Sequence, residues 1–447
     1  MKKIFLILLS LALFTACERK IDTFKVSNGS ANFNKYIAVG NSLFAGYADG
    51  ALYHNGQKNS IPNLIAGQLQ LAGSGAFVQP MVNSEFGVAF TGSAPKLKLG
   101  YSIDCKNVTS LGPVADLGTK DPLAPLGYDV NNFAVPGAKS FHILAPHYGD
   151  PSLLPLGKAN PYFFRFAKTA ASSVLGDAMA ANATFFTLWL GDNDVLSYAL
   201  SGGMDTITSP AFFQTVMGGV LQGLTTNGAK GVVSTIPDVT AIPFFTTIPY
   251  NGLVLTRQSL VDSINYAMDS VYRLPFHYVV GQNPFMVPDP TSPHPYFKVR
   301  LMKPGELVLM TVPQDSMKCY GMGIINSLTH YPFPIPKQYF LSLNDVSQLQ
   351  SATIAYNQII VALAANFKLG VVDMNTKLTQ LQKGIVWNGI TLNTTFVTGG
   401  VFSLDGIHLN PRGCALAANF FIEAINNYYG STVPYVDVTK YPGVIFP

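Results

Sequence analysis

Near its N-terminus the chain reads Tyr36-Ile-Ala-Val-Gly-Asn-Ser-Leu-Phe-Ala45, and the other predicted elements are arranged around this stretch. It begins with an apolar run of residues that favour β-structure, and Gly40 breaks the run before the polar pair Asn41-Ser42. The pattern predicts a buried strand with a serine just beyond its carboxyl end. Ligands of open α/β sheets bind at that end of the strands, so Ser42 is a candidate functional residue. A turn residue or a helix cap is the more ordinary role of such a serine.

Four further apolar segments predict the other strands of the same sheet. These segments are residues 128–137, 184–190, 231–237 and 371–373. Helical spacing of apolar residues and capping signals predict helices at residues 61–71, 212–224, 259–271, 346–367 and 411–429. Strands that alternate with helices are typical of parallel sheets with right-handed crossovers. The sequence therefore predicts an α/β fold, a doubly wound and mainly parallel five-stranded sheet flanked by helices, with loop-rich insertions.

The N-terminus has the form of a secretory signal. Residues 1–16 combine a basic start with a short apolar run at residues 4–14 and small residues before Cys17. The run is shorter than the ~20 apolar residues of a spanning helix. Its end, Thr-Ala-Cys, resembles a bacterial lipoprotein signal, which implies cleavage before Cys17 and a lipid on that thiol. An ordinary signal with an incidental cysteine is the alternative. We expect an exported protein anchored to a membrane of the cell envelope, with the outer membrane as its location.

The remaining chain divides into a tether, one large domain and a tail. Residues 17–34 are polar and predict a tether, residues 35–430 form the predicted domain, and residues 431–447 form a C-terminal tail. Two insertions interrupt the domain pattern, the Gly-, Ser- and Pro-rich residues 72–127 and the Pro- and aromatic-rich residues 277–345. The second insertion either forms a wall of a substrate cleft or extends away from it, and the sequence leaves both open.

The composition excludes nucleic acid as a partner. The formal net charge is +4, of which Lys2 and Lys3 of the predicted signal supply two, and there is no block of Lys or Arg. Charged residues make up 12% of the chain, against roughly 25% in ordinary globular proteins. This low charge suits an exported protein with a polar but uncharged surface.

Three cysteines follow Cys17, namely Cys105, Cys319 and Cys414. Their odd number allows at most one disulfide within the chain, and isolated buried thiols are the state that we expect. The sequence contains no Cys-x-x-Cys motif and no Cys/His cluster at metal-ligand spacing. We therefore expect neither a metal nor another cofactor.

A turn near the C-terminus places an acid beside a histidine. Asp405 and His408 lie three residues apart, directly before the helix for which Asn410 is a good N-cap and Pro411 a good first residue. This spacing lets a carboxylate reach Nδ1 of the imidazole and leaves Nε2 free to take a proton from a serine. A structural histidine is the commoner alternative, and a metal pair would need a second cluster that the nearby sequence lacks.

Four motifs occur in a fixed order along the chain. They are Gly40-Asn41-Ser42-Leu43, Ala134-Val-Pro-Gly137, Gly191-Asp192-Asn193-Asp194 and Asp405-Gly406-Ile407-His408. Together they resemble the SGNH, or GDSL-like, hydrolase family, whose pattern is Gly-Asp-Ser, a lone glycine, Gly-x-Asn-Asp and Asp-x-x-His. The resemblance spans roughly residues 35–430 and leaves both insertions outside the minimal pattern. It implies a flavodoxin-like arrangement of three layers.

The resemblance also implies a role for each matched residue. Ser42 would be the nucleophile, His408 the general base and acid, and Asp405 the residue that orients His408. The oxyanion hole would consist of the backbone N–H groups of Ser42 and Gly137 and the side-chain amide of Asn193. These roles are chemically consistent, because a serine hydroxyl needs a base to become nucleophilic. Developing negative charge needs donors fixed in advance, each worth about 2.7–4 kcal/mol.

The resemblance implies a serine esterase or lipase that hydrolyses carboxylic esters through an acyl-enzyme intermediate. Acylated or acetylated carbohydrate, a lipid and a small soluble ester are the candidate substrates. The usual aspartate before the nucleophile is Asn41 here. That departure and the large insertion motivate a second hypothesis, a catalytically inactive surface-binding lipoprotein on the same scaffold. Since the implied proton path does not use residue 41, activity is the first expectation.

Overall fold

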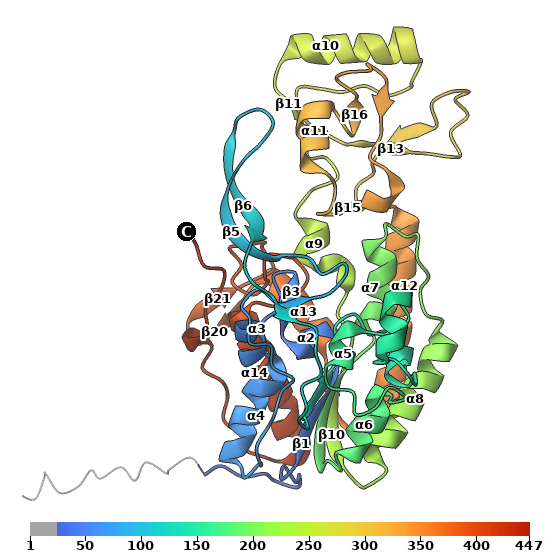
Figure 1. The fold of residues 1–447 in the computed structure, drawn as a ribbon. Coiled ribbons are helices and arrows are strands. Elements are labelled where there is room, and N and C mark those ends of the chain that lie inside the picture. Colours follow the sequence, from blue (N-terminus) through green and yellow to red (C-terminus); the bar gives the residue numbers. More distant parts are fainter. Residues whose placement is uncertain (1–24) are drawn as a thin grey trace, which may run out of the picture.

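The computed structural model describes residues 25–447, and its centre is a five-stranded parallel sheet (Figure 1). The strands are β1 (Tyr36–Gly40), β8 (Asn132–Ala134), β9 (Phe185–Trp189), β10 (Lys230–Ser234) and β19 (Gly370–Val372). Their order in the sheet is β19-β10-β9-β1-β8, and each neighbouring pair is parallel. All five predicted strands are present, and the predicted α/β fold is confirmed.

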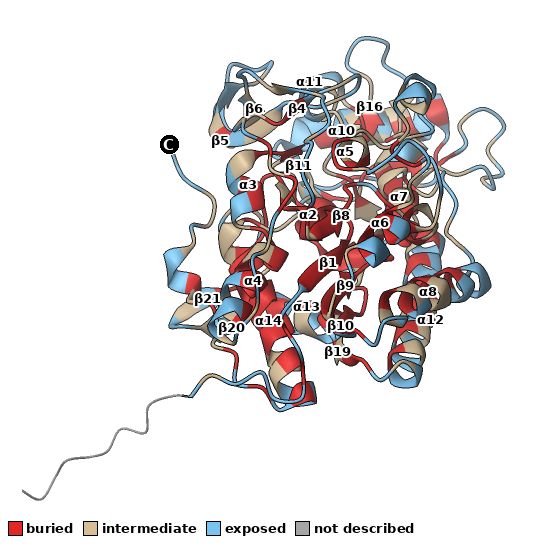
Figure 2. Cartoon of the chain, turned by 60° about the horizontal axis from the view of Figure 1, so that its bottom comes forward, coloured by how far each residue is buried: buried red, intermediate tan, exposed pale blue. Residues whose placement is uncertain are grey.

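Helices cover both faces of the sheet and make a three-layer structure (Figure 1). One face carries α4 (Ile61–Leu71) and α14 (Pro411–Tyr429), which pack on each other. The other face carries α6, α7, α8 and α12, which are Val174–Ala180, Asp192–Leu200, Pro210–Thr225 and Leu343–Asn366. Figure 2 shows buried residues concentrated in the strands and on the inner sides of these helices. This distribution is the outcome expected when apolar helix faces pack on a sheet.

Local sequence explains where the two helices on the first face begin. The Ser60 hydroxyl accepts a hydrogen bond from Asn63 N at the start of α4, and Pro62 lies in its first turn. The Asn410 side chain accepts from Gly413 N at 2.9 Å, and Pro411 is the first residue of α14. Both arrangements satisfy backbone N–H groups that a helix leaves unpaired at its start. The predicted bounds of α4 and α14 are confirmed.

The order of the strands reverses beside β1. The next strand of this sheet along the chain, β8, pairs with one edge of β1, and the one after it, β9, pairs with the other edge. Such a reversal opens a crevice outside the carboxyl ends of the strands, where doubly wound folds bind ligands. At this end Gly40 lies beside both Ala134 and Trp189. A Cβ on Gly40 would lie 2.6 Å from the Trp189 carbonyl oxygen, which explains the glycine.

The two predicted insertions have short elements of their own. Within residues 72–127, strands β5 (Lys96–Ile103) and β6 (Thr109–Asp116) form an antiparallel hairpin. Residues 248–339 form a lobe, which includes α10 (Gln258–Tyr266) and α11 (Gln314–Tyr320) at the top of Figure 1. Apolar side chains of this lobe form buried clusters around Tyr278 and Val308. The lobe takes in α10, which precedes the predicted insertion.

A disulfide joins the β5–β6 turn to helix α11. It links Cys105 to Cys319 across 214 residues of sequence, with Cα atoms 6.4 Å apart. The prediction of isolated buried thiols is therefore wrong for these two residues, because spacing does not indicate which cysteines meet in space. Cys414 is a free and buried thiol, as predicted, and burial raises its pKa to about 12.

The predicted signal peptide at residues 1–16, the predicted anchor Cys17 and the start of the tether lie outside the described residues. The described chain begins beside α14, where Ser30 N donates to the Tyr429 carbonyl oxygen at 2.8 Å and Thr432 N donates to that of Ser27 at 2.9 Å. Within residues 25–447, no helix has both the length and the apolar character needed to cross a membrane.

Candidate active site

Ser42 lies at the first turn after β1 and faces His408. It is the first residue of the short helix α2 (Ser42–Ala45), for which Asn41 is the cap and accepts a hydrogen bond from Leu43 N at 3.0 Å. Ser42 is 9% exposed, and its Oγ lies 2.8 Å from Nε2 of His408. The end of β1 and the loop before α14 therefore bring together two residues that are 366 positions apart in sequence.

Asp405 holds His408 from the other side of the imidazole. Oδ2 of Asp405 lies 2.8 Å from Nδ1 of His408 and also accepts from Gly50 N at 3.1 Å. Oδ1 accepts from the Ser403 hydroxyl at 3.0 Å and from the backbone N–H groups of Ile407 and His408 at 2.9 and 2.8 Å. Burial alone would raise the pKa of this carboxyl, but attraction to His408 when the imidazole is protonated and these hydrogen bonds hold it far below its usual range.

These contacts determine which imidazole nitrogen carries the proton. An ionised carboxylate only accepts hydrogen bonds, so Nδ1 of His408 donates to Asp405. In the neutral imidazole, Nε2 is then the acceptor, and the Ser42 hydroxyl donates to it. This tautomer follows from the hydrogen-bond network, as is usual for histidine. The arrangement leaves Ser42 Oγ ready to lose its proton to His408.

Gly137 and Asn193 line the same cavity as Ser42 and His408. Gly137 has a φ of +78°, in the left-handed region that favours glycine. The Asn193 side chain donates to the Ala138 carbonyl oxygen at 2.9 Å, which fixes the orientation of its amide. An amide nitrogen carries a second N–H, and for Asn193 that group has no partner within residues 25–447. The structure thus brings all five predicted site residues together, counting Asp405 behind His408.

Asp192 links the third motif to the first. Its Oδ2 accepts from the Asn41 side-chain amide at 2.7 Å, and its Oδ1 accepts from Nε1 of Trp189 at 3.1 Å. Burial raises the pKa of Asp192 to about 6, although both hydrogen bonds oppose the rise. Sequence comparison with the family motif did not reveal this role of Asn41. The available signal was an amide in place of the usual aspartate of the first motif and an acid at the variable position of the third.

Asp194 fixes the loop that follows Gly137. Its two carboxylate oxygens accept from the backbone N–H and the hydroxyl of Ser140, each at 2.7 Å. Burial raises the pKa of Asp194, and the hydrogen bonds from Ser140 partly offset that rise. The side chains of residues 192–194 therefore form hydrogen bonds to Asn41 after β1, to the Ala138 carbonyl oxygen and to Ser140. The N-terminus of α7 organises the loops around the cavity.

Sequence reasoning missed a turn that supports Asp405. Asp49 has a φ of +52°, and its backbone N–H donates to the Ser403 hydroxyl at 3.0 Å. Its carboxylate accepts from Leu404 N at 2.9 Å and from the Tyr53 hydroxyl at 2.8 Å. The next residue, Gly50, bonds directly to Asp405. No motif marks this turn, because its partners Ser403, Leu404 and Asp405 lie more than 350 residues away in the sequence.

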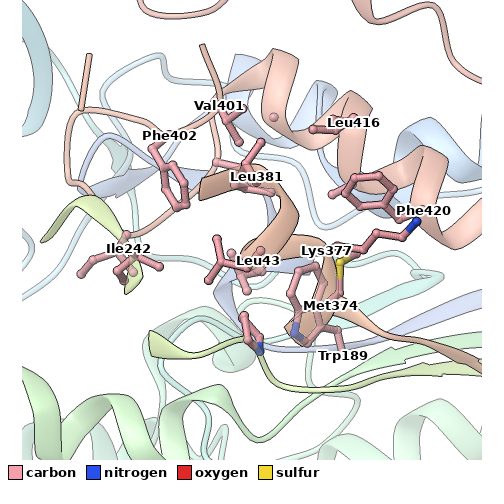
Figure 3. A pocket seen from close by; sticks show the side chains of 16 residues that line it. Leu43, Trp189, Ile242, Met374, Lys377, Leu381, Val401, Phe402, Leu416 and Phe420 are labelled. Atoms are coloured by element: carbon pink, nitrogen blue, oxygen red, sulfur yellow. The ribbon is translucent and has the colours of Figure 1, made fainter. Parts of the chain in front are cut away.

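The cavity beside Ser42 has a volume of about 340 Å³. Its lining contains no Asp, Glu, Lys or Arg, and most of it is apolar or aromatic. Figure 3 shows a smaller cavity of about 80 Å³, whose lining shares Ile407 with the cavity beside Ser42. Leu43, Leu381 and Phe402 contribute to its apolar lining, and it contains none of the candidate site residues. The larger cavity is therefore the candidate substrate site. Among the described residues, no group of three His, Cys, Asp or Glu is placed to hold a metal ion.

Comparisons with known proteins give little beyond these observations. No protein-family model and no curated protein matches the chain. Among solved structures, it is similar to a lipase/acylhydrolase from Enterococcus faecalis, at 10% identity and a TM-score of 0.32, over 90% of this chain and 100% of that one. It is also similar to a GDSL-like lipase from Parabacteroides merdae, at 10% identity and a TM-score of 0.35, over 90% and 99%. A likeness at this level carries no argument about activity.

Proposed function

We propose that this protein is a serine hydrolase that cleaves carboxylic esters at Ser42. One observation carries the proposal: hydrogen bonds connect Ser42, His408 and Asp405. Ser42 Oγ lies 2.8 Å from Nε2 of His408, and Nδ1 of the same ring lies 2.8 Å from Oδ2 of Asp405. A serine, a base and an acid in this geometry form a nucleophile with its activating base. Ser42 and His408 line a cavity that is large enough for a small ligand.

The first chemical step forms an acyl-enzyme. Ser42 Oγ attacks the ester carbonyl carbon as its proton moves to Nε2 of His408, and the carbonyl electron pair moves to the oxygen. When the tetrahedral intermediate collapses, the bond to the alcohol oxygen breaks and that oxygen takes the proton from Nε2. Asp405 remains ionised and stabilises the imidazolium that forms in between. Its strongly lowered pKa suits this role.

The second step returns the enzyme to its starting state. Water attacks the acyl carbon, loses a proton to Nε2 of His408, and Ser42 recovers that proton as the carboxylic acid leaves. In both steps the backbone N–H groups of Ser42 and Gly137 and the free N–H of Asn193 would stabilise the oxyanion. Protons and electron pairs balance among these groups, the substrate and water, so the proposed route calls for no cofactor.

The test compares hydrolysis of p-nitrophenyl acetate and butyrate by the wild type and by Ser42→Ala. Ser74 is half-buried and lies outside the lining of the cavity beside Ser42, and it provides the matched control variant, Ser74→Ala. We expect Ser42→Ala to lose nearly all activity and Ser74→Ala to keep it. A fluorophosphonate should also label Ser42 of the folded wild type, as located by mass spectrometry. Equal rates for wild type and Ser42→Ala would contradict the proposal.

The competing hypothesis, an inactive binding protein, rests mainly on Asn41. The hydrogen bond from Asn41 to Asp192 explains structurally why an amide stands at position 41, and this explanation does not require a loss of activity. Tight binding of esters without turnover by the wild type, and without labelling by fluorophosphonate, would favour the binding protein.

We also propose that the mature chain is exported and anchored through a lipid on Cys17. The basis is the sequence of residues 1–17 alone. In cell fractionation, the Cys17→Ser variant should be found in the soluble fraction instead of the membrane fraction. Retention of the variant in the membrane fraction would contradict the anchor without affecting the proposed chemistry at Ser42.

A further inference from the structure

One wall of the cavity beside Ser42 is aliphatic and belongs to helix α7. Asn193, Leu196 and Leu200 all line the cavity. They follow one another at positions i, i+3 and i+7, which places them on one face of a helix. Leu196 is 8% exposed, so its side chain is well packed and offers a fixed surface. Leu196 and Leu200 therefore form an aliphatic surface that extends along α7 from the Asn193 amide.

A second wall of the cavity is aromatic and leads to His408. The Tyr47 ring lies 4.8 Å from the imidazole, the Tyr162 ring lies 6.2 Å from Tyr47, and the Phe90 ring lies 5.3 Å from Tyr162. All four rings line the cavity. The last two contacts are edge-to-face, a favourable arrangement for aromatic pairs. These rings form a continuous surface from the imidazole to the loop of the first insertion.

A lysine holds that loop over the cavity. Nζ of Lys120 donates to the Ser93 carbonyl and hydroxyl oxygens, each at 3.0 Å, and to the Ala94 carbonyl oxygen at 2.7 Å. Ser93 and Ala94 line the cavity together with Phe90, whereas Lys120 does not. The ammonium is thus directed to the back of the loop. Since the lining has no Asp, Glu, Lys or Arg, an ionised substrate group would lose its hydration there without gaining a partner.

We infer that the two walls receive different halves of an uncharged ester: a short aliphatic acyl chain on Leu196 and Leu200, and an alcohol with a flat ring on Tyr47, Tyr162 and Phe90. This inference rests on the proposed function. The carbonyl oxygen must lie near Asn193, where the leucine stripe begins. The leaving oxygen must lie within reach of Nε2 of His408, beside the aromatic wall.

The size of the cavity limits the substrate class further. Its volume of about 340 Å³ lies near the lower end of the ~300–1,000 Å³ range of ligand pockets. A volume at this end of the range favours a short acyl chain beside a ring over a long one. The ring is an aryl group or a sugar, since both present an uncharged flat face to an aromatic wall.

The experiment measures kcat/KM on two series of esters. One series varies the acyl chain from acetate to butyrate to octanoate on benzyl alcohol, and the other attaches butyrate to ethanol, benzyl alcohol or glucose. Leu200→Trp should lower the butyrate-to-acetate ratio about 10-fold, since even one methylene in an apolar pocket changes rates that much. Phe90→Ala should lower the ring-to-ethyl ratio about 2- to 10-fold. Each variant should leave the other ratio unchanged.

Further variants separate specificity from folding. Leu200→Ala enlarges the same wall and should shift the preference toward longer acyl chains. Leu71→Trp places the same bulky residue at an exposed leucine at the end of α4 and should change neither ratio. Whether the benzyl or the glucose ester is preferred over the ethyl ester identifies the ring. Wild type that prefers neither, or that prefers octanoate, would overturn the inference.

The outcomes also separate this inference from the proposed function. If wild type hydrolyses no ester of either series and Ser42→Ala behaves identically, the proposed function fails. If hydrolysis depends on Ser42 but Leu200→Trp alters the alcohol ratio, or Phe90→Ala alters the acyl ratio, only the assignment of the two walls fails.

Discussion

Changing Asn41 to aspartate, the usual residue of the motif that residues 40–43 resemble, should destabilise this protein. The Asn41 amide donates to Oδ2 of Asp192 at 2.7 Å, and the two residues are only 1% and 5% exposed. In Asn41→Asp, a carboxylate would replace this donor and face a second carboxylate at hydrogen-bond distance. Two buried like charges this close cannot both ionise, so the pair would share one proton.

The magnitude follows from the contacts that are lost. A hydrogen bond to a charged group contributes about 1.5–3 kcal/mol. Burial already raises the pKa of Asp192 to about 6, against about 3.9 in an unfolded chain, so ionisation of this carboxyl costs on the order of 3 kcal/mol by pH 7. A second carboxylate raises the upper pKa of the pair further. We expect Asn41→Asp to lower the free energy of unfolding at pH 7 by about 2–4 kcal/mol.

The pH dependence gives a sharper signature than the loss at one pH. In the wild type, the folded state binds Asp192's proton more tightly than the unfolded state, so this carboxyl favours folding at low pH and the benefit is lost as pH rises through about 6. Above pH 7 its contribution is constant. In Asn41→Asp the folded pair still holds a proton there, so stability should fall by up to ~1.36 kcal/mol per pH unit.

The assay is urea unfolding between about pH 7 and pH 8.5, a range in which the contribution of Asp192 to wild-type stability no longer changes with pH. It compares wild type, Asn41→Asp, and the double variant Asn41→Asp/Asp192→Asn, which restores one acid and one amide with their positions exchanged. The double variant should regain most of the free energy of unfolding that Asn41→Asp loses. Its stability should no longer fall as the pH rises. Asn132→Asp is the control, because Asn132 is also buried but donates to the Phe44 carbonyl and to Gln79. Asp192→Asn should not rescue it.

Two results would refute this account of Asn41. The first is an Asn41→Asp variant as stable as the wild type with the same pH dependence. The second is a double variant no more stable than Asn41→Asp alone, since an interaction between the two positions requires non-additive effects.

Three further predictions concern other parts of the molecule. Asp405→Asn should lower kcat/KM by roughly 10²- to 10⁴-fold with little change in fold by circular dichroism, because an amide supports the wrong imidazole tautomer; unchanged kcat/KM would contradict the role of Asp405. Replacing Cys105 and Cys319 by serine should lower unfolding stability by about 2–4 kcal/mol while esterase activity remains; an unchanged urea midpoint would count against this contribution. Gly40→Ala should destabilise the fold and lower its melting temperature, because the new Cβ would meet the Trp189 carbonyl oxygen; an unaltered melting temperature would argue against that close contact.

The elements predicted best are those whose environment is uniform along the chain. Strands β1 and β9 are buried at every position, so a continuous apolar run marks them directly. Helix α14 was predicted to the residue at its start because Asn410 and Pro411 carry the capping signal locally. The lobe that includes α10 was harder to delimit, since its short strands pair across long loops and its prolines interrupt any periodicity.

The residues of the candidate site fall into two groups for the same reason, since some carry a local sequence signal and others do not. Ser42, Gly137, Asn193, Asp405 and His408 were found because each belongs to a short motif beside a strand or helix. The residues that hold them belong to no motif. The Asp49–Gly50 turn supports Asp405 through bonds that exist only after β1 and the loop before α14 are brought together. The Cys105–Cys319 disulfide depends on folding in the same manner.

Asn41 shows why a motif compared position by position misses part of the chemistry. Taken alone, it replaces an acid by an amide and removes a charge next to the nucleophile. Taken with Asp192, the pair contains one donor and one acceptor, and the end of β1 remains bonded to the start of α7. Folding requires that the two side chains complement each other, and either order of acid and amide satisfies this condition. The departure at position 41 therefore concerns how two adjacent loops are joined, and it leaves the proton path between Ser42 and His408 intact.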